Sequence, residues 1–402
     1  MGFVELITLL LSLTGFGIQA NPKAPTADQS LQYAMPDPDV VVHIDAATIV
    51  PNNYKLLAAL PNKPEIKASP ELSKMVRQVV GQVEGARGLA KGATGVDIAT
   101  DINDATVFIQ LVPQKEPAFV ATVHGKFSTA LVDKIGKMTK GTVTKVGSAM
   151  MVETTPTDPA IGVTKDGVML AGTANLVRDR LADSWKSPPH GAGTNLGYSA
   201  DVINAHPVYA VVLTMSASAR KQVIQGVGGK NFLTDLVTRH KLLSFSVFAD
   251  GVGWSWIDSS KAGLDSMGMM SEGVLELMKA AQIAPRAVAK IALGGIDSYK
   301  GTSKQIDALI ARKADVLKLV DTYTGDGNFK VSINKDPSKL RLDVRATGKS
   351  LSEVVSAGMF LPGAAMFLLM GRNASSISQQ QPMEQVEPAK PAKPPALGGG
   401  RK

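Results

Sequence analysis

The chain has 402 residues, enough for two ordinary domains, and 44% of them are hydrophobic, which is typical of globular cores rather than of disorder. The formal net charge is +8, but the basic residues are spread along the chain and no strand interleaves aromatic residues with Arg or Lys, so the sequence disfavours nucleic-acid binding. The absence of cysteine excludes disulfides, thiolate metal sites, a cysteine nucleophile and a lipid-modified cysteine.

Residues 1–20 have the pattern of a signal peptide. They run apolar from Phe3 to Leu13 and end in Ile18-Gln19-Ala20 before a polar, Pro-containing linker at 21–36. We therefore expect export to the periplasm or cell envelope, with cleavage after Ala20. No Lys or Arg precedes the apolar run and Glu5 lies near its start, so a short uncleaved membrane anchor and a buried helix stay open as alternatives.

Residues 37–186 are predicted to form a first α+β unit. Ser69-Pro70 is typical of a helix start, because Ser caps the free amides and Pro loses nothing in the first turn. In chain order we expect a buried strand at 39–45, a helix from Ser69, a hairpin of strands 104–112 and 118–124, a helix capped by Ser128, two strands near 142–153 and 160–171, and a helix from Thr173 to Trp185.

A boundary is predicted between 186 and 200, where Pro188-Pro189-His190-Gly191 and Gly193 interrupt the pattern. The same order of elements then begins again. We expect a strand at 208–215, helical residues at 217–239 with a break at Gly226–Gly229, a hairpin of strands 242–249 and 252–258 across Asp250-Gly251, a Met-rich helix over about 261–282, a helix at 303–321, and a last hairpin of 329–333 and 340–344.

Both halves give the order strand, helix, hairpin, helix, hairpin, helix. Strands joined as hairpins rather than by single crossovers favour antiparallel α+β layers over a doubly wound parallel sheet. We therefore predict an α+β fold of two similar repeats, 37–186 and 200–371, each an antiparallel sheet backed by helices.

The C-terminal region holds a second apolar run, 354–371, which is close to the lower length limit for a bilayer span and contains Pro362. We expect it to be the closing helix of the second repeat, packed through Val355, Met359, Phe360 and Phe367; a membrane anchor is the alternative. Residues 372–402 are polar and rich in Pro, Ala, Lys and Gly, so we expect a disordered tail.

No catalytic, metal or cofactor motif stands out. The five histidines, at 43, 124, 190, 206 and 240, include no pair at helical metal-ligand spacing, and His43 and His124 fit satisfied core or edge positions on strands. The glycine-rich stretches 191–197 and 226–230 lack the spacing of nucleotide loops, and 321–328 fails as an EF-hand. The Met residues of the helix near 270 are read as flexible core, with a ligand groove as the alternative.

Four short stretches resemble a family of exported bacterial proteins of unknown function with duplicated α+β domains. They are Met35-Pro36-Asp37 before 39–49, Gly95–Ile102, His124–Ser128 and Leu170–Thr173. The resemblance covers about 35–185, and less clearly 200–345. It implies export and a duplicated fold, and it supplies no catalytic residue.

The sequence thus favours an exported, non-enzymatic bacterial envelope protein with a binding or scaffolding role. One alternative is a hydrolase-type enzyme whose site is not visible as a motif, for instance a carboxylate site near Asp97 and Asp101. Another is an envelope protein held in the membrane by 354–371. No cofactor is expected. The partners that stay open are a membrane or cell-wall surface, contacted through 354–402, and another protein.

Overall fold

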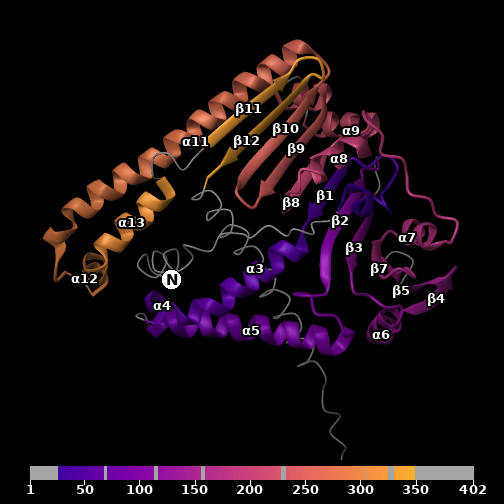
Figure 1. The fold of residues 1–402 in the computed structure, drawn as a ribbon, viewed down its shortest axis with the longest axis horizontal. Coiled ribbons are helices and arrows are strands. Elements are labelled where there is room, and N and C mark those ends of the chain that lie inside the picture. Colours follow the sequence, from indigo (N-terminus) through magenta and orange to yellow (C-terminus); the bar gives the residue numbers. More distant parts are fainter. Residues whose placement is uncertain are drawn as a thin grey trace, which may run out of the picture.

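The computed structural model describes residues 26–67, 70–112, 116–154, 159–227, 232–302, 304–324 and 330–348 (Figure 1). The signal peptide, the helix at 354–371 and the tail at 372–402 that the sequence predicts lie outside the described residues.

The described strands form one twelve-stranded antiparallel sheet in the order β11-β12-β10-β9-β8-β1-β2-β3-β7-β6-β5-β4. The strands are β1 (Val40–Ile44), β2 (Ile102–Gln110), β3 (Ala118–Gly125), β4 (Thr142–Val146), β5 (Ala149–Glu153), β6 (Ala160–Val163), β7 (Val168–Gly172), β8 (Tyr209–Leu213), β9 (His240–Phe248), β10 (Gly251–Asp258), β11 (Lys330–Asp336) and β12 (Arg341–Thr347). The predicted antiparallel α+β class is therefore correct.

The expectation of a separate sheet for each half is corrected by the structure. β1 pairs with β8 in the middle of the sheet, with Val42 opposite Val211, so the two halves share one continuous ladder. Both strands are short and apolar, and each has antiparallel partners on its two sides, which leaves no free edge at the centre.

The inner part of the strand order is symmetric about this central pair, although the described sheet has seven strands on the β1 side and five on the β8 side. Going outward, one half gives β1, β2, β3 and β7, and the other gives β8, β9, β10 and β12. The hydrogen bonds at the strand starts correspond as well. Asp39 N donates to Ile109 O and Val208 N to Val247 O, while Thr214 N donates to Asp39 O and Asp45 N to Val208 O. β1 and β8 therefore make corresponding hydrogen bonds to each other and to their outer neighbours.

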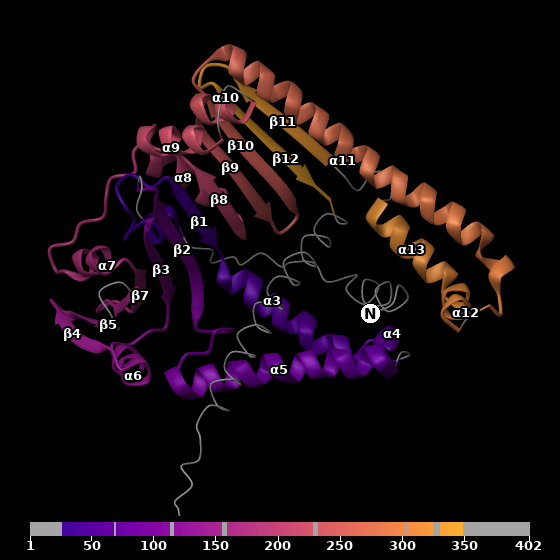
Figure 2. The ribbon, with the colours of Figure 1, turned by 180° about the vertical axis from the view of Figure 1, so that it is seen from behind.

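The helices lie on both faces of the sheet and beyond it (Figures 1 and 2). They are α2 (Ala27–Ser30), α3 (Ala46–Ala59), η1 (Leu60–Asn62), α4 (Pro64–Lys67), α5 (Pro70–Thr94), α6 (Ala130–Thr139), α7 (Ala174–Leu181), α8 (Asn195–Ile203), α9 (Ala217–Val227), α10 (Phe232–Arg239), α11 (Lys261–Gly295), η2 (Ile296–Tyr299), α12 (Lys304–Ala311) and α13 (Lys313–Thr324).

One sheet face, called the inner face here, is covered by α2, α7 and α8. Leu31, Val177 and Leu196 from this layer pack with Val41 and Val212 of the central strands in the largest core cluster. On the opposite face, called the open face, α6 packs over the strands at one end, through Leu131 and Val132 among others, and α11 packs over β10 and β12 at the other, against Trp256 and Leu342.

Two helical arms extend from the sheet (Figures 1 and 2). The arm of residues 46–94 comprises α3, η1, α4 and α5 and has its own apolar cluster, which includes Leu57, Ile66 and Val83. The arm of residues 261–324 begins with α11, which is much longer than the predicted helix of 261–282 because it continues through Pro285 to Gly294-Gly295.

Several local expectations differ from the structure. Residues 142–153 and 160–171 each form two strands, because Gly147 and Gly167 adopt positive φ angles of 58° and 79° and allow tight turns. Ser128 makes no side-chain cap, since α6 begins at Ala130 after Thr129. The described part of the predicted linker, 26–36, is packed into the core through Leu31, Ala34 and their neighbours.

Candidate functional site

The inner face buries polar groups at its centre. His43, Asp104, Thr106 and Thr122 are all buried there. His43 Nδ1 lies 3.0 Å from Thr106 Oγ1, and the Asp104 carboxylate lies 3.0 Å from His124 Nδ1 and accepts a bond from Ser30 Oγ of α2. Burial lowers the pKa of His43 to about 4, opposed by the nearby Asp104 carboxylate. The bond from Ser30 to Asp104 holds α2 on the sheet, and burial keeps His43 neutral near pH 7.

The open face has the opposite character at its centre. Away from the register shifts at the exposed polar residues Asn103 of β2 and Lys241 of β9, the side chains that β3, β2, β1, β8 and β9 place there are apolar, and nearly all are only half-buried. This central apolar face consists of Val40, Val42, Ile44, Ala105, Val107, Ile109, Phe119, Ala121, Tyr209, Val211, Leu213, Leu243 and Phe245. Antiparallel sheets normally turn polar side chains to their less covered face, so this pattern marks a surface that contacts something apolar.

The first helix of the second arm extends this apolar surface. Asp265 of α11 pairs with Lys335 of the edge strand β11, so that flank of the helix faces the edge of the sheet. Met270, Val274 and Leu277 follow at helical spacing on the opposite flank of the helix. They are exposed, Leu277 to 71%, and Phe245 is exposed to 45%.

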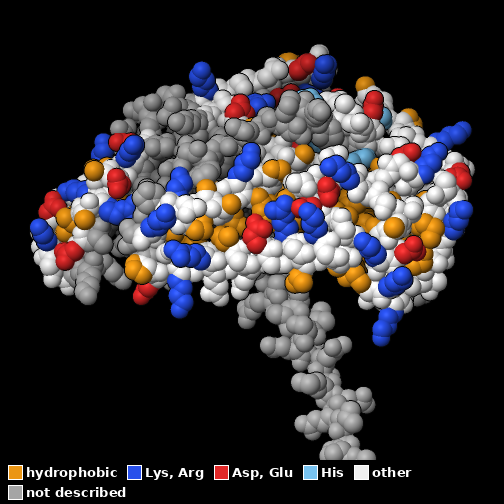
Figure 3. All heavy atoms as spheres, turned by 60° about the horizontal axis from the view of Figure 1, so that its bottom comes forward, with side chains coloured by type: hydrophobic (Ala, Val, Ile, Leu, Met, Phe, Trp, Pro, Cys, Tyr) orange, Lys and Arg blue, Asp and Glu red, His pale blue; other side chains and the backbone are white. Residues whose placement is uncertain are grey.

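The arms carry most of the excess positive charge. Residues 46–94 contain seven basic and three acidic residues, and residues 261–324 contain nine basic and seven acidic ones, against +8 for the chain. In the view from below, hydrophobic side chains lie among Lys and Arg side chains (Figure 3). Both arms that extend from the sheet therefore have a positive balance.

The carboxylates suspected of catalysis, Asp97 and Asp101, lie together but are fully engaged. Asp97 accepts bonds from Arg87 Nε at 2.8 Å and Nη2 at 2.9 Å, from Lys91 at 3.3 Å and from the Ala99 amide. Asp101 accepts from the Asp97 amide at 2.8 Å. The Arg87 guanidinium holds the pKa of Asp97 well below its usual range. This network fixes the loop after α5 and leaves no free base.

The other residues considered from sequence are not brought together. His190 lies near Asp28, His206 is exposed with a positive φ, and the His240 ring lies against the Trp256 ring at a tilt of 41°, each in a different part of the fold. Within the described ranges, no three His, Asp or Glu residues are arranged to hold a metal ion. The Met-rich helix does supply an apolar surface, formed by Met269, Met270 and their neighbours, in addition to the core contact of Met267.

No described helix combines the length and apolar character that a membrane span needs. No protein-family model matches the chain, and a sequence comparison with curated proteins found no match. Among solved structures, crystal form I of TP0453 matches with a TM-score of 0.33 and 10% identity, covering 83% of this chain and 98% of that one. Crystal form IV matches with 0.30 and 9% identity over 57% and 80%. Likeness at this level carries no argument about function.

Proposed function

We propose that this protein is an exported, non-enzymatic binding protein that holds the acyl chains of an anionic lipid against the central apolar face. The observation that carries the proposal is the half-buried central apolar face together with the exposed apolar residues of α11. Apolar surface left near water costs roughly 25 cal/mol per Å², so a ligand that covers it gains free energy. A broad sheet face suits long flexible chains, which can spread over it.

The positive balance of the two arms favours an anionic lipid over a neutral one. Basic residues such as Lys55 and Lys74 on the first arm, and Lys261 and Lys290 on the second, are exposed. Their charges attract an anionic headgroup, and the attraction weakens as salt is added. The acyl chains supply most of the affinity, and the arms add charge selectivity.

The geometry supports binding over catalysis. On the inner face, buried Asp104 accepts a bond from Ser30 of α2, and buried His43 lies within hydrogen-bond distance of Thr106. Asp97 is held in ion pairs. A hydrolase needs a nucleophile or base that substrate can reach. The described polar clusters serve the fold instead.

Two further parts of the proposal concern the chain as a whole. We infer that the fold arose by duplication of one α+β unit, which the symmetric strand order about β1 and β8 supports. Export through residues 1–20, packing of 354–371 on the second repeat and disorder of 372–402 remain proposals. A truncation after Gly371 should leave the protein stable, and one after Leu351 should make it aggregate rather than release it from a membrane.

The test is binding of oleate to the purified full chain, measured by displacement of a fluorescent fatty acid. Phe245→Asp and Leu277→Asp each place a charge on the proposed surface at an exposed position, so the fold should survive. We expect each variant to bind about tenfold or more weakly, because a lost large apolar contact is worth about 1.5–3 kcal/mol. Methyl oleate, which has no charge, should bind more weakly than oleate.

Met138→Asp is the matched control, since Met138 is an exposed apolar residue of α6 outside the proposed surface. It should bind oleate as the unaltered chain does. Equal weakening by all three substitutions, or no oleate binding by the unaltered chain, would contradict the proposed function.

A further inference from the structure

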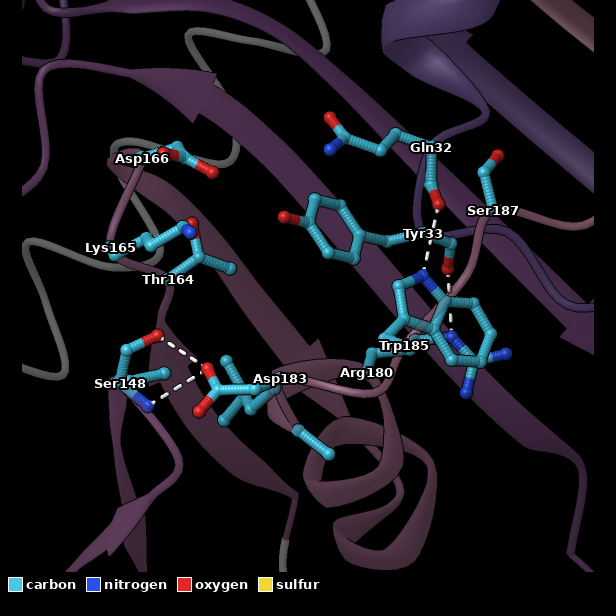
Figure 4. A pocket seen from close by; sticks show the side chains of 13 residues that line it. Gln32, Tyr33, Ser148, Thr164, Lys165, Asp166, Arg180, Asp183, Trp185 and Ser187 are labelled. Atoms are coloured by element: carbon cyan, nitrogen blue, oxygen red, sulfur yellow. Dashed lines mark hydrogen bonds between the residues drawn. The ribbon is translucent and has the colours of Figure 1, made fainter.

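A separate pocket lies at the far end of the first half, away from the central apolar face. It has a volume of about 490 Å³ and is formed where three segments meet: residues 32–33 after α2, the turns before β5 and β7, and the end of α7 with the chain that follows (Figure 4). Tyr33 and Trp185 line it together with Gln32, Ser148, Thr164 and Ser187. The size suits one or two sugar rings or a short peptide.

The walls of this pocket are held in place by bonds that need no ligand. Arg180 is buried and donates from Nε to Tyr33 O at 2.8 Å, from Nη2 to Ala34 O at 3.1 Å and from Nη1 to Leu176 O at 2.8 Å. Its guanidinium lies over the Trp185 ring, with Cζ 4.6 Å from the ring centroid, and Trp185 Nε1 donates to Gln32 O. The Trp185 side chain and the backbone at Tyr33 are therefore fixed before any ligand arrives.

The charges around the pocket are balanced within it. Asp183 accepts bonds from the amide and hydroxyl of Ser148, which lower the pKa of its carboxyl, and Lys165 lowers it further. Lys165 and Asp166 are adjacent in the β6–β7 turn and offset each other. The Arg180 charge is directed to backbone carbonyls and to an aromatic ring. No net charge is left to select an ion, which favours a neutral ligand.

We propose that this pocket binds a neutral saccharide. A pyranose ring has an apolar C–H face that packs on an aromatic ring and an edge of hydroxyls that both donate and accept. The pocket offers both partners: Tyr33 and Trp185 as the apolar wall, and the exposed groups of Gln32, Ser148 and Ser187 as hydrogen-bonding neighbours. This site is independent of the proposed lipid surface.

The experiment follows the Trp185 indole N–H signal by NMR while three neutral disaccharides, chitobiose, maltose and cellobiose, are added to the folded full chain at up to about 10 mM. We expect at least one to shift this signal in a saturable way while the signals of Trp254 and Trp256 stay unchanged. Lys165→Ala should alter the affinity less than threefold, because a neutral ligand makes no ion pair.

Ser187→Ala and Gln32→Ala, both exposed positions, should weaken saccharide binding severalfold, and Trp185→Phe should retain the fold and part of the binding. The proposal is overturned if no disaccharide shifts the Trp185 signal at the highest concentration. It is also overturned if a zwitterionic dipeptide binds in place of the sugars, or if Lys165→Ala abolishes binding, since either result would assign a charged ligand.

Discussion

The two faces of the central sheet reverse the usual distribution of polarity. The covered inner face buries His43, Asp104 and Thr106, whereas the less covered open face presents only apolar side chains at its centre. Buried polar groups are tolerated because they bond to one another and to Ser30. The half-exposed apolar side chains of the open face, by contrast, leave apolar surface in contact with water, and no described part of the chain covers it fully.

This difference separates what holds the fold together from what the fold presents. The inner face stabilises the structure through α2, α7 and α8, so a change there should act on stability. The open face is only partly covered, so a change there should act on binding. Neighbouring residues of one strand point to opposite faces of the sheet. Substituting each of two such neighbours therefore compares the two faces directly.

Substitution of two neighbours in β8 should give the largest contrast. Val212 is fully buried on the inner face, and Val211 is half-buried on the open face. Val212→Asp should cost about 4 kcal/mol or more, because an unpaired carboxylate is buried there, whereas Val211→Asp should cost about 1–2 kcal/mol. Urea unfolding of both variants measures the difference. Equal losses would mean that the two faces are equally covered.

Acidification should next affect the inner face through His43. The pKa of His43 is lowered to about 4 in the fold from 6.5 in the unfolded chain, so the unfolded chain binds more protons between these values. Stability should be intact above pH 6.5 and fall by up to about 1.4 kcal/mol per unit as the pH drops toward 4. The free energy of unfolding of His43→Gln, measured over this range, should show a shallower slope. An unchanged slope would show that His43 is not the residue responsible.

The loop network at Asp97 should give an intermediate effect that separates a structural role from a catalytic one. Asp97→Asn should cost about 2 kcal/mol, since the carboxylate loses charge-assisted bonds from Arg87 and Lys91. Because the pKa of Asp97 is lowered, its contribution is present above about pH 4 and is lost as the pH falls further. Thermal unfolding at pH 7 and pH 3 tests both points. Asp133→Asn, an exposed carboxylate of α6, is the control and should change little.

The smallest effect is expected on the α11 flank. Leu277→Ser should change stability by less than about 0.5 kcal/mol, because that side chain is mostly exposed. Its helix neighbour Leu275 is buried against the sheet, and Leu275→Ser should cost about 2–4 kcal/mol. Guanidinium unfolding compares them. A large loss from Leu277→Ser would show that part of the chain already covers this flank.

The sequence predicted the hairpins and most helix positions because they depend on local signals. Asp250-Gly251 between two alternating segments indicated the β9–β10 hairpin, and Pro70 marked the start of α5. The pairing of β1 with β8 could not be predicted, since it joins segments about 170 residues apart by backbone bonds that carry no residue signature. Two short apolar strands have the same sequence pattern whether they pair with each other or belong to separate sheets.

The proposed surfaces were harder to predict than the fold. Val40, Val41 and Val42 form a continuous apolar run, which indicates a strand buried on both faces. Only the structure shows that alternate residues of this run are half-exposed. The exposed flank of α11 was partly visible as a Met-rich helix. The pocket at Trp185 combines segments near 32, 148, 165 and 185, and no spacing along the chain links them.

The central claim is that acyl chains lie on the open face, and photolabelling tests it most directly. The full chain would be irradiated with a fatty acid that carries a photoactivatable group near the end of its acyl chain, and the labelled peptides would be identified by mass spectrometry. We predict labels within β1, β8, β9 and α11, on open-face residues such as Val42, Val211 and Phe245, and suppression by excess oleate. Labels confined to other surfaces, or labels that oleate does not reduce, would contradict the claim.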